Sequence, residues 1–478
     1  MTRFLLFSIR FLDDRYHGLT DNGEKAEWPP SPFRVFLALV AGNARGPKLS
    51  ESIRSALRWL ESLDPPDIIA PQAQQGRVSL TYVLNNTPDR SRAPKTAHPT
   101  VLNGDRLVQY AWKFDVSQPN ATEYVGTLKE AARHINALGW GIDLAIGYGE
   151  IVEQLPSPTE LRVHYRAAAT VFFGGLELRV PRRDSLASLE RTYADFLRRY
   201  ELPGITKLES AGAIYKPHRY IVGTARPSVV FRLVNADGDT VSVQHKLISP
   251  LVGMMKALAN RPHVVVSLGQ DVIDREIKGH PKESTGDRVS VLPLPTIRQG
   301  PTDGRIRRIM LAQPQESNGA LCDRLGQLFD GQELAPLSDE KRFPSIFLER
   351  IARRDTVLPY YTGISCVWAS VTPVLLPGYD DRKDHHGDHQ KRLARAEQLV
   401  RKALRQANIN VPSQVELSRV PYWVGSLHAQ NYRPREKLAH YPCWHVRLTF
   451  DRPFTGPLVI GAGRHCGFGV FARIDDTE

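Results

Sequence analysis

The sequence predicts an α+β fold built from two related units in tandem. Its 478 residues exceed the roughly 150 that one domain usually holds, so two or three domains are expected. Short segments of alternating apolar residues are separated by turn-forming residues, which is typical of strands. A strand followed by an apolar helix opens the chain and recurs about halfway along it. Apolar residues make up 41% and charged residues 24% of the chain, which excludes wholesale disorder and a fibrous repeat.

The first half is expected to begin with a half-buried strand, because Phe7, Ile9 and Phe11 alternate with other residues. A helix should follow, since Ser31 can cap it and Pro32 suits its first turn. The expected elements of this half are a strand at 4–11, helices at 33–43, 50–63 and 124–138, and short strands between 72 and 120.

The second half repeats this opening. Glycine, alanine and proline mix over residues 208–218, which predicts a linker, and a second domain is expected to begin near Arg226. The predicted domains therefore span 1–215 and 226–478. The expected elements are strands at 229–234, 240–243, 306–311, 366–376, 445–450 and 458–460, and helices at 245–258 and 390–407.

The charge balance points to a polyanionic partner. Lysine and arginine total 63 against 51 aspartates and glutamates, which gives a net charge of +12 and favours nucleic acid. The longest apolar run, at 35–41, is far shorter than the roughly 20 residues that span a bilayer. The four cysteines lie too far apart for a disulfide framework or a zinc motif. We therefore expect no membrane partner, no cofactor and a cytoplasmic location.

The sharpest motif is glycine-rich and spans residues 461–469, with the sequence GAGRHCGFG. A dinucleotide-binding turn would need a following helix and an acidic residue some 20 positions later, but only nine residues follow Gly469. The motif could instead contact phosphate, or it could form a tight bend between two final strands. In the first interpretation the RNA-binding residues are Gly461, Gly463, Arg464, His465, Gly467 and Gly469.

Histidines can transfer protons near neutral pH, so several are candidates for a nuclease that needs no metal. They are His218, His245, His263, His280 and His465. His280 lies in a polar loop, where it is free to face a substrate. His245 precedes Lys246 at a predicted helix start, where the pair could transfer a proton and hold a phosphate, or merely cap the helix. No metal site is predicted, because the histidines near residues 384–389 lack helical spacing and cysteine support.

Basic residues recur on two other predicted elements. Arg392 and Arg395 lie opposite the apolar stripe of the helix at 390–407, and Arg305 and Arg307 lie at the strand near 306–311. This repetition suits a phosphate backbone. For the helix taken alone, a solvated face over an apolar stripe is the favoured explanation.

Eight stretches spread over nearly the whole chain carry a resemblance to a known family. They are RFLDDRYHG at 10–18, EWPPSPFR at 27–34, ALRWLE at 56–61, GH at 279–280, LPLP at 292–295, DG at 303–304, WASVTPVLL at 368–376 and GPLVIGAGR at 456–464. Together they resemble the fused subunit of type I-G (formerly I-U) CRISPR effectors that binds CRISPR RNA (crRNA) and processes its repeats.

The resemblance implies tandem ferredoxin-like (RRM-like) folds. Residues 1–215 are similar to the subunit that grips the 5′ handle of crRNA, and residues 226–478 to the endoribonuclease that cuts CRISPR repeats. That class of nuclease needs no metal, because a deprotonated 2′-hydroxyl attacks the adjacent phosphate. The implied partners are repeat RNA, mature crRNA and the backbone and large subunits of a type I effector. The family's glycine-rich loop contacts RNA, which favours the phosphate interpretation of the motif.

The resemblance also implies catalytic residues. His280 matches its motif and is the first choice for proton transfer, with His245 second, while Lys246 and Arg464 would stabilise negative charge. Family histidines expected before LPLP and before DG are replaced here by Arg288 and Thr302, so neither position is an obligatory acid or base. Two alternatives stay open: a non-catalytic RNA-binding subunit, and a metal-dependent nuclease that uses His385, His386 and His389.

Overall fold

A computed structural model describes most of the chain, namely residues 2–21, 23, 25–44, 49–84, 92–156, 162–168, 175–201, 214–279, 288–297, 302–335, 343–351, 355–379, 388–409 and 413–474. Its contacts divide the chain into two compact units. The first comprises Met1–Ala167 and Leu176–Gly223, and the second comprises Ala168–Gly175 and Thr224–Glu478. Within the described ranges, no helix is both long and apolar enough to cross a membrane.

The first unit is built on an antiparallel sheet with the strand order β11-β12-β10-β3-β8-β1-β9. Its strands are β1 (Thr2–Phe11), β3 (Asp67–Pro71), β8 (Leu107–Asp115), β9 (Ala145–Val152), β10 (Arg162–Ala167), β11 (Leu176–Pro181) and β12 (Tyr215–Val222). Its helices are α1 (Pro32–Asn43), α2 (Glu51–Ser62), α3 (Ala121–Ala132) and α4 (Ser185–Glu201). Along the chain, α1 and α2 lie between β1 and β3, and α3 joins β8 to β9.

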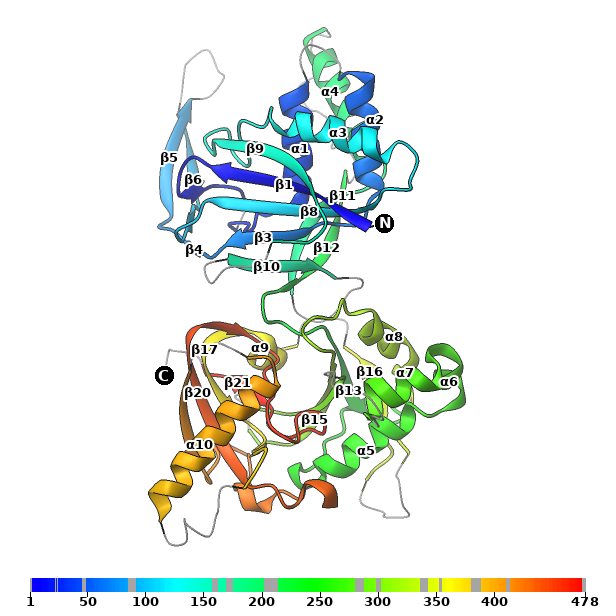
Figure 1. Ribbon diagram of the computed structural model, residues 1–478, viewed down its shortest axis with the longest axis vertical. Coiled ribbons are helices and arrows are strands. Elements are labelled where there is room, and N and C mark those ends of the chain that lie inside the picture. Colours follow the sequence, from blue (N-terminus) through cyan, green and yellow to red (C-terminus); the bar gives the residue numbers. More distant parts are fainter. Residues whose placement is uncertain are drawn as a thin grey trace. The chain divides into compact units, whose positions relative to one another are not determined.

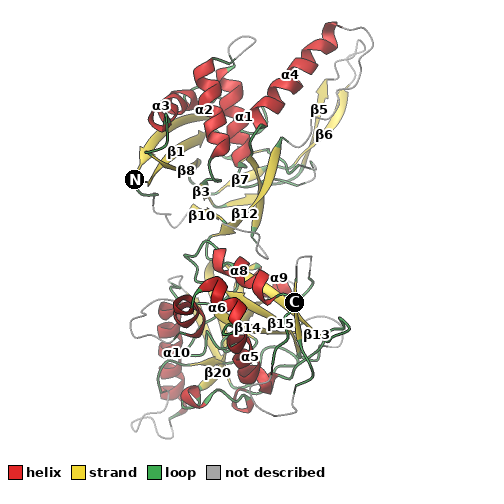
Figure 2. Ribbon diagram, turned by 90° about the vertical axis from the view of Figure 1, so that its right-hand side faces the viewer, coloured by secondary structure: helices red, strands yellow, loops and turns green. Residues whose placement is uncertain are grey.

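The strand predicted at the start of the chain is confirmed. Phe7 and Ile9 are fully buried and lie beside Tyr110 and Val108 of β8. These side chains share one core with the apolar faces of α1, α2 and α3, which cover this face of the sheet (Figures 1 and 2). Ser8 on the other face is also buried, so β1 is covered on both faces rather than half-buried.

The predicted helices are present, with differences at their ends. Helix α1 begins at Pro32 as expected, but the side chain of Ser31 does not cap it. In α2 the Ser50 hydroxyl accepts a hydrogen bond from the backbone of Ile53. Helix α3 ends at Ala132, earlier than expected, because the following residues turn back through a bridge between Ala137 and Leu144 that leads into β9.

Short strands fill the region between residues 72 and 120, as predicted. Two of them, β4 and β7, form a sheet with β2 in the order β2-β7-β4, and two others form a hairpin. These strands are β2 (Arg15–Tyr16), β4 (Ala73–Gln75), β7 (Thr100–Leu102), and the hairpin strands β5 (Ser79–Leu84) and β6 (Arg92–Ala97).

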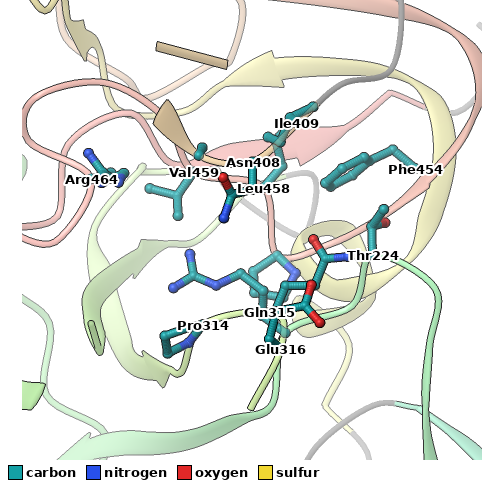
Figure 3. A pocket seen from close by; sticks show the side chains of 13 residues that line it. Thr224, Pro314, Gln315, Glu316, Asn408, Ile409, Phe454, Leu458, Val459 and Arg464 are labelled. Carbon is teal, nitrogen blue, oxygen red and sulfur yellow. The ribbon is translucent and has the colours of Figure 1, made fainter. Parts of the chain in front are cut away.

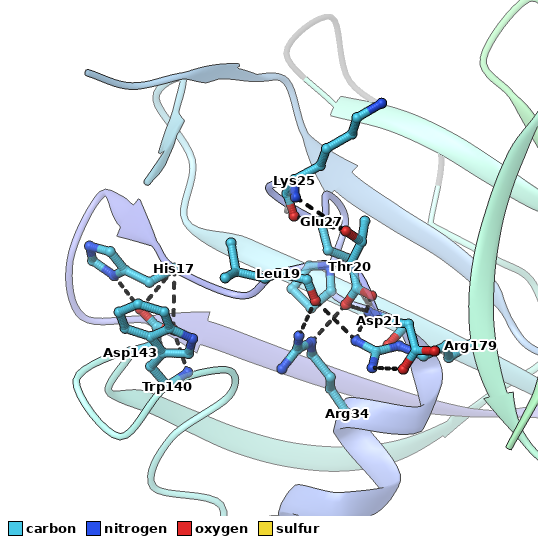
Figure 4. A network of polar contacts seen from close by, with 12 residues as sticks. His17, Leu19, Thr20, Asp21, Lys25, Glu27, Arg34, Trp140, Asp143 and Arg179 are labelled. Carbon is cyan, nitrogen blue, oxygen red and sulfur yellow. Dashed lines mark hydrogen bonds and ion pairs between the residues drawn. The ribbon is translucent and has the colours of Figure 1, made fainter. Parts of the chain in front are cut away.

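A buried ionic network fixes the segment before α1 (Figure 4). The Glu27 side chain is only 5% exposed and accepts hydrogen bonds from Arg34 Nε at 2.7 Å and Arg179 Nη2 at 2.8 Å. Its carboxylate also accepts the backbone N–H of Ser31. Both guanidinium groups donate to the carbonyl of Leu19. Part of the stretch at 27–34 therefore serves to join the chain before α1 to β11.

The second unit contains two antiparallel sheets. The first has the order β14-β15-β13-β16 and its strands are β13 (Ser228–Val234), β14 (Ser290–Pro295), β15 (Ile306–Ala312) and β16 (Phe347–Arg350). The helices between β13 and β14 are η1 (His245–Leu247), α5 (Ile248–Leu258), α6 (Pro262–Leu268), α7 (Gln270–Val272) and the π-helical η2 (Ile273–Lys278). Helix α8 (Ala320–Phe329) connects β15 to β16.

The second sheet of this unit has the order β18-β20-β17-β21, and β19 also pairs with β20. Its strands are β17 (Ile364–Ser370), β18 (Val374–Leu375), β19 (Ser413–Ser418), β20 (Cys443–Thr455) and β21 (Phe471–Arg473). The other elements of this part are α9 (Leu358–Thr362), α10 (His389–Gln406), η4 (Ala429–Asn431) and η5 (Glu436–Leu438). The apolar stripe predicted on α10 is confirmed, since Ala396, Val400 and Ala403 are buried against this sheet.

Three sheets share one connectivity. In each, the first strand lies between the third and the fourth, and the second lies beyond the third: β9-β1-β8-β3, β16-β13-β15-β14 and β21-β17-β20-β19. Helices follow the first and third strands of the first two sheets. In the last sheet α10 follows β17, but the glycine-rich residues 456–470 take the place of the second helix. The predicted α+β class is confirmed.

Two expectations about the middle of the chain are wrong. Residues 215–218 of the expected linker belong to β12, which pairs with β10 and β11, while 208–213 lie outside the described residues. The strand expected at 240–243 is reduced to isolated bridges from Thr240 to Val234 and from Val243 to Ile306. Backbone pairing to two different partners prevents this short segment from forming one ladder.

Candidate nucleic-acid interface

A basic pocket in the second unit brings together residues from three distant segments. Lys246 comes from η1, Arg305 from the turn before β15, and Arg433 from the long connection between β19 and β20. The pocket has a volume of about 610 Å³ and is also lined by Phe343 and Gln244. Its charged lining residues are all cations, so it offers a positive surface with one aromatic ring. Phosphate and nucleobase groups are the ligands that match this combination.

Backbone contacts fix the shape of this basic pocket. Val243, three residues before Lys246, pairs with Ile306 through two backbone hydrogen bonds of 2.8 Å. The Arg305 Nη2 donates to the carbonyl of Ser242, and the Ser249 hydroxyl donates to the carbonyl of Arg433. These bonds tie all three cationic segments to the start of α5.

One close approach explains why a glycine stands at position 304. Gly304 and Gly425 have positive φ angles of 64° and 84°, and their backbones touch. A Cβ on Gly304 would lie 2.2 Å from the carbonyl oxygen of Gly425. The contact therefore needs two glycines, and it holds the connection that carries Arg433 against the turn that carries Arg305.

His245 lies in the core behind the basic pocket. Its side chain is buried, and its Nδ1 lies 2.7 Å from the hydroxyl of Tyr432. Burial lowers the pKa of His245 to about 4, so the ring is neutral at pH 7. The neighbouring Lys246 is exposed. Of the predicted pair, the lysine faces the pocket and the histidine faces the protein interior.

This burial makes the stability of the second unit depend on pH. The unfolded chain binds a proton on His245 below about pH 6.5, whereas the folded chain does so only near pH 4, so stability present above pH 6.5 is lost as the pH falls towards 4. The loss amounts to about 3 kcal/mol. We expect His245→Gln to shrink the difference in unfolding free energy between pH 7 and pH 4 by about this amount, as measured by urea unfolding. An unchanged difference would contradict the assignment.

Other predicted RNA-binding arginines lie outside this pocket. Arg307 donates two hydrogen bonds to Asp303, at 2.8 and 2.6 Å, and these bonds lower the pKa of Asp303 to about 2. Arg307 is therefore ion-paired. Arg392 and Arg395 lie half-buried on α10, where Arg395 bonds Gln398. Neither lines the basic pocket.

The glycine-rich loop is packed rather than open. Gly461, Gly467 and Gly469 have positive φ angles, and a Cβ on Gly469 would lie 2.0 Å from the carbonyl oxygen of Ile460. Gly463 packs against Phe468. Several loop N–H groups already donate to backbone carbonyls within the unit, namely those of residues 462, 464, 466, 468 and 469. Tight packing is therefore one reason for glycine at these positions.

The loop also carries two basic side chains, Arg464 and His465. Arg464 lines a second pocket, of about 220 Å³, together with Arg226, Gln315, Glu316 and Asn408. Figure 3 shows Gln315 and Glu316 on the opposite side of this pocket from Asn408. His465 is buried, and its Nδ1 lies 3.1 Å from the hydroxyl of Ser290 on β14.

Some predicted residues lie outside the described part of the chain, and others were missed. His280, His385 and His386 are not among the described residues. Within the described ranges, no group of three or more histidine, cysteine, aspartate or glutamate side chains could hold a metal ion. Sequence reasoning missed Arg433, whose only signal was a proline flanked by two arginines in a long connection, and Arg226, which it treated as a domain boundary.

Comparison with known proteins supplies the family. No curated protein matches the sequence. Residues 6–473 match the family described as CRISPR-associated protein, GSU0054 family, so the match covers both units. The chain belongs to this CRISPR-associated family.

Proposed function

We propose that this protein binds CRISPR repeat RNA, cleaves precursor crRNA within the repeats, and keeps the mature crRNA as part of a type I effector (Cascade) complex. The observation that carries the proposal is the convergence of Lys246, Arg305 and Arg433 on one basic pocket. Three cations from separate segments suit a phosphodiester backbone, and membership of a CRISPR-associated family makes CRISPR RNA the natural polyanion. The proposed protein partners are the backbone and large subunits of such an effector.

We further propose that the three sheets with shared connectivity are ferredoxin-like, or RRM-like, units. Alternation of strand, helix, strand, strand, helix and strand is the pattern of that fold, and the observed strand orders support it. One unit of this kind lies in the first half, which we assign to the 5′ handle, and two lie in the second half, which we assign to repeat processing. The count is one more than the tandem pair expected from the sequence.

The proposed reaction needs a base, an acid and cations. A base removes the proton of a 2′-hydroxyl, the oxygen attacks the adjacent phosphate, and an acid protonates the departing 5′-oxygen, leaving a 2′,3′-cyclic phosphate and a 5′-hydroxyl. We propose His280 for proton transfer, and Lys246 and Arg464 for charge stabilisation. Because His245 is buried and bonded to Tyr432, its place favours positioning Lys246 rather than direct contact with RNA.

Cleavage in EDTA tests this proposal. Purified protein is incubated with a precursor RNA that contains the repeat of its own CRISPR array, and the products are analysed for a 2′,3′-cyclic phosphate. We expect cleavage in EDTA and a loss of about 100-fold or more in rate for His280→Ala, because general acid–base catalysis contributes at least that much. His134→Ala, which changes an exposed histidine of the first unit, is the matched control. Cleavage only after a divalent metal is added back would contradict the mechanism.

A second candidate function is a structural RNA-binding subunit without catalysis. The burial of His245 favours it, because one of the two proposed proton-transfer residues faces the core. It predicts tight repeat binding together with unchanged processing in cells that carry His280→Ala or His245→Ala. The two candidate functions therefore predict different fractions of processed RNA in these variants, but the same affinity for repeat RNA.

A further inference from the structure

The second pocket is chemically suited to a phosphate group. Arg226 and Arg464 place two guanidinium groups on its lining. Asn408 and Thr224 add further polar side chains (Figure 3). Glu316 adds a carboxylate at the same pocket. Guanidinium groups bind phosphate oxygens with charge-assisted, often paired hydrogen bonds.

A chain of hydrogen bonds leads from this pocket to His465. The Arg226 Nη2 donates to the Ser290 hydroxyl at 3.0 Å, and that hydroxyl lies 3.1 Å from His465 Nδ1. Arg226 is held in place by the carbonyls of Gln313 and Ala312. A change of charge next to Arg226 therefore reaches His465 through one bridging hydroxyl.

The surroundings of His465 are strongly cationic. On its own loop it lies between Arg464 and Cys466; Lys256 of α5 approaches Cys466, with 3.7 Å between Nζ and Sγ. Burial first, and then the charges of Arg464, Arg288, Arg226 and Lys256, lower the pKa of His465 well below its usual value. Burial lowers the pKa of Lys256, and the charges of Arg288 and Arg435 lower it further. The imidazole is consequently neutral in the free protein.

We infer that the pocket lined by Arg226 and Arg464 binds one phosphate group of the RNA, and that His465 takes up a proton when it does. This inference rests on the proposed RNA binding and adds to it a specific subsite. A phosphate placed beside Arg226 and Arg464 offsets part of the repulsion that a positive imidazole meets there. The protonated ring can then donate its Nδ1–H to Ser290, whereas the neutral ring can accept from it.

Proton uptake on binding determines the direction in which RNA affinity changes with pH. Because the bound state holds one more proton than the free state, RNA affinity must rise as the pH falls. The limiting slope is about tenfold in affinity per pH unit for one proton. A site that merely screens charge takes up no proton and shows no such slope.

Calorimetry measures the proton directly. Full-length protein is titrated at pH 6.5 with its repeat RNA carrying 2′-O-methyl groups throughout, so that it cannot be cleaved, in two buffers with different heats of ionisation. The difference in binding heat between the buffers gives the number of protons taken up. We expect a net uptake of protons by the wild type, the same uptake in His134→Gln, and loss of this uptake in His465→Gln together with weaker RNA binding.

Several outcomes would overturn the inference. Tight binding with no proton uptake contradicts the subsite, and so does uptake that persists in His465→Gln, whereas absence of any RNA binding contradicts the proposed function instead. If His465→Gln does not fold, carbon-13 NMR of histidine-labelled wild type serves in its place. It should show a histidine that stays neutral at pH 6.5 in the free protein and becomes protonated when the RNA is added. A histidine spectrum without that change also contradicts the inference.

Discussion

Replacing Lys246 and Arg305 together by glutamate is expected to weaken the binding of repeat RNA by about 100-fold or more. Both side chains line the basic pocket, and reversing them turns its three cations into one cation and two anions. Like charges brought together at an interface cost several kcal/mol, and every 1.4 kcal/mol is tenfold in affinity. The slope of log affinity against log salt should also fall by about two, because two phosphate contacts are lost. Filter binding at several salt concentrations measures both quantities.

The control for this variant is a pair with the same change in net charge. Arg275→Glu combined with Arg324→Glu alters two exposed arginines of the same unit that line neither pocket. We expect this pair to weaken binding by less than about tenfold, since only long-range attraction is reduced. Equal losses in the two double variants would show that total charge, and not the basic pocket, determines affinity.

Replacing Glu27 by alanine is expected to destabilise the first unit by about 3–5 kcal/mol. Arg34 and Arg179 share the Glu27 carboxylate as an acceptor. Without this carboxylate, two largely buried guanidinium groups lose their ion pair with Glu27. Breaking a buried ion pair by removing one partner has a cost of this size, because an uncompensated charge remains in the interior. Hydrogen exchange of peptides from β1 and α1 in the intact chain, measured in a series of urea concentrations, reports the free energy of opening of this unit.

An exposed ion pair of the same unit provides the comparison. Glu153 lies 3.6 Å from Arg3, and its side chain is 69% exposed. Such pairs contribute at most about 1 kcal/mol, so Glu153→Ala should change the same free energy by no more than that. If Glu27→Ala lowers the free energy of opening no more than Glu153→Ala does, water must solvate Arg34 and Arg179 in place of the carboxylate.

Periodicity predicted the elements well, because it follows from which residues must be buried. The two-residue spacing of Phe7 and Ile9 predicted β1. The helical spacing of Ala396, Val400 and Ala403 predicted α10. The linker was wrong because glycine, alanine and proline are common in irregular segments, whereas Tyr215 and the residues after it are kept in a strand by pairing with β11. Strand pairing over long distances leaves no local trace in a sequence.

The candidate site could be predicted only in part, for the same reason. Lys246 and Arg305 were both expected to contact RNA, but their meeting in one pocket depends on the bridge between Val243 and Ile306. His245 looked available beside Lys246, yet successive residues in a helical turn point in different directions, and the histidine faces Tyr432. Glycines of the last loop pack closely against Ile460, Leu375 and Phe468, which the local sequence alone does not reveal.

The connection that supplies Arg433 also sets when the basic pocket can exist during translation. His245 and Tyr432 are 187 positions apart, so all the residues between them must be synthesised before they can meet. Domains fold as units while the ribosome proceeds, and contacts between distant residues form late. A prematurely terminated chain that stops before Arg433 therefore lacks the basic pocket.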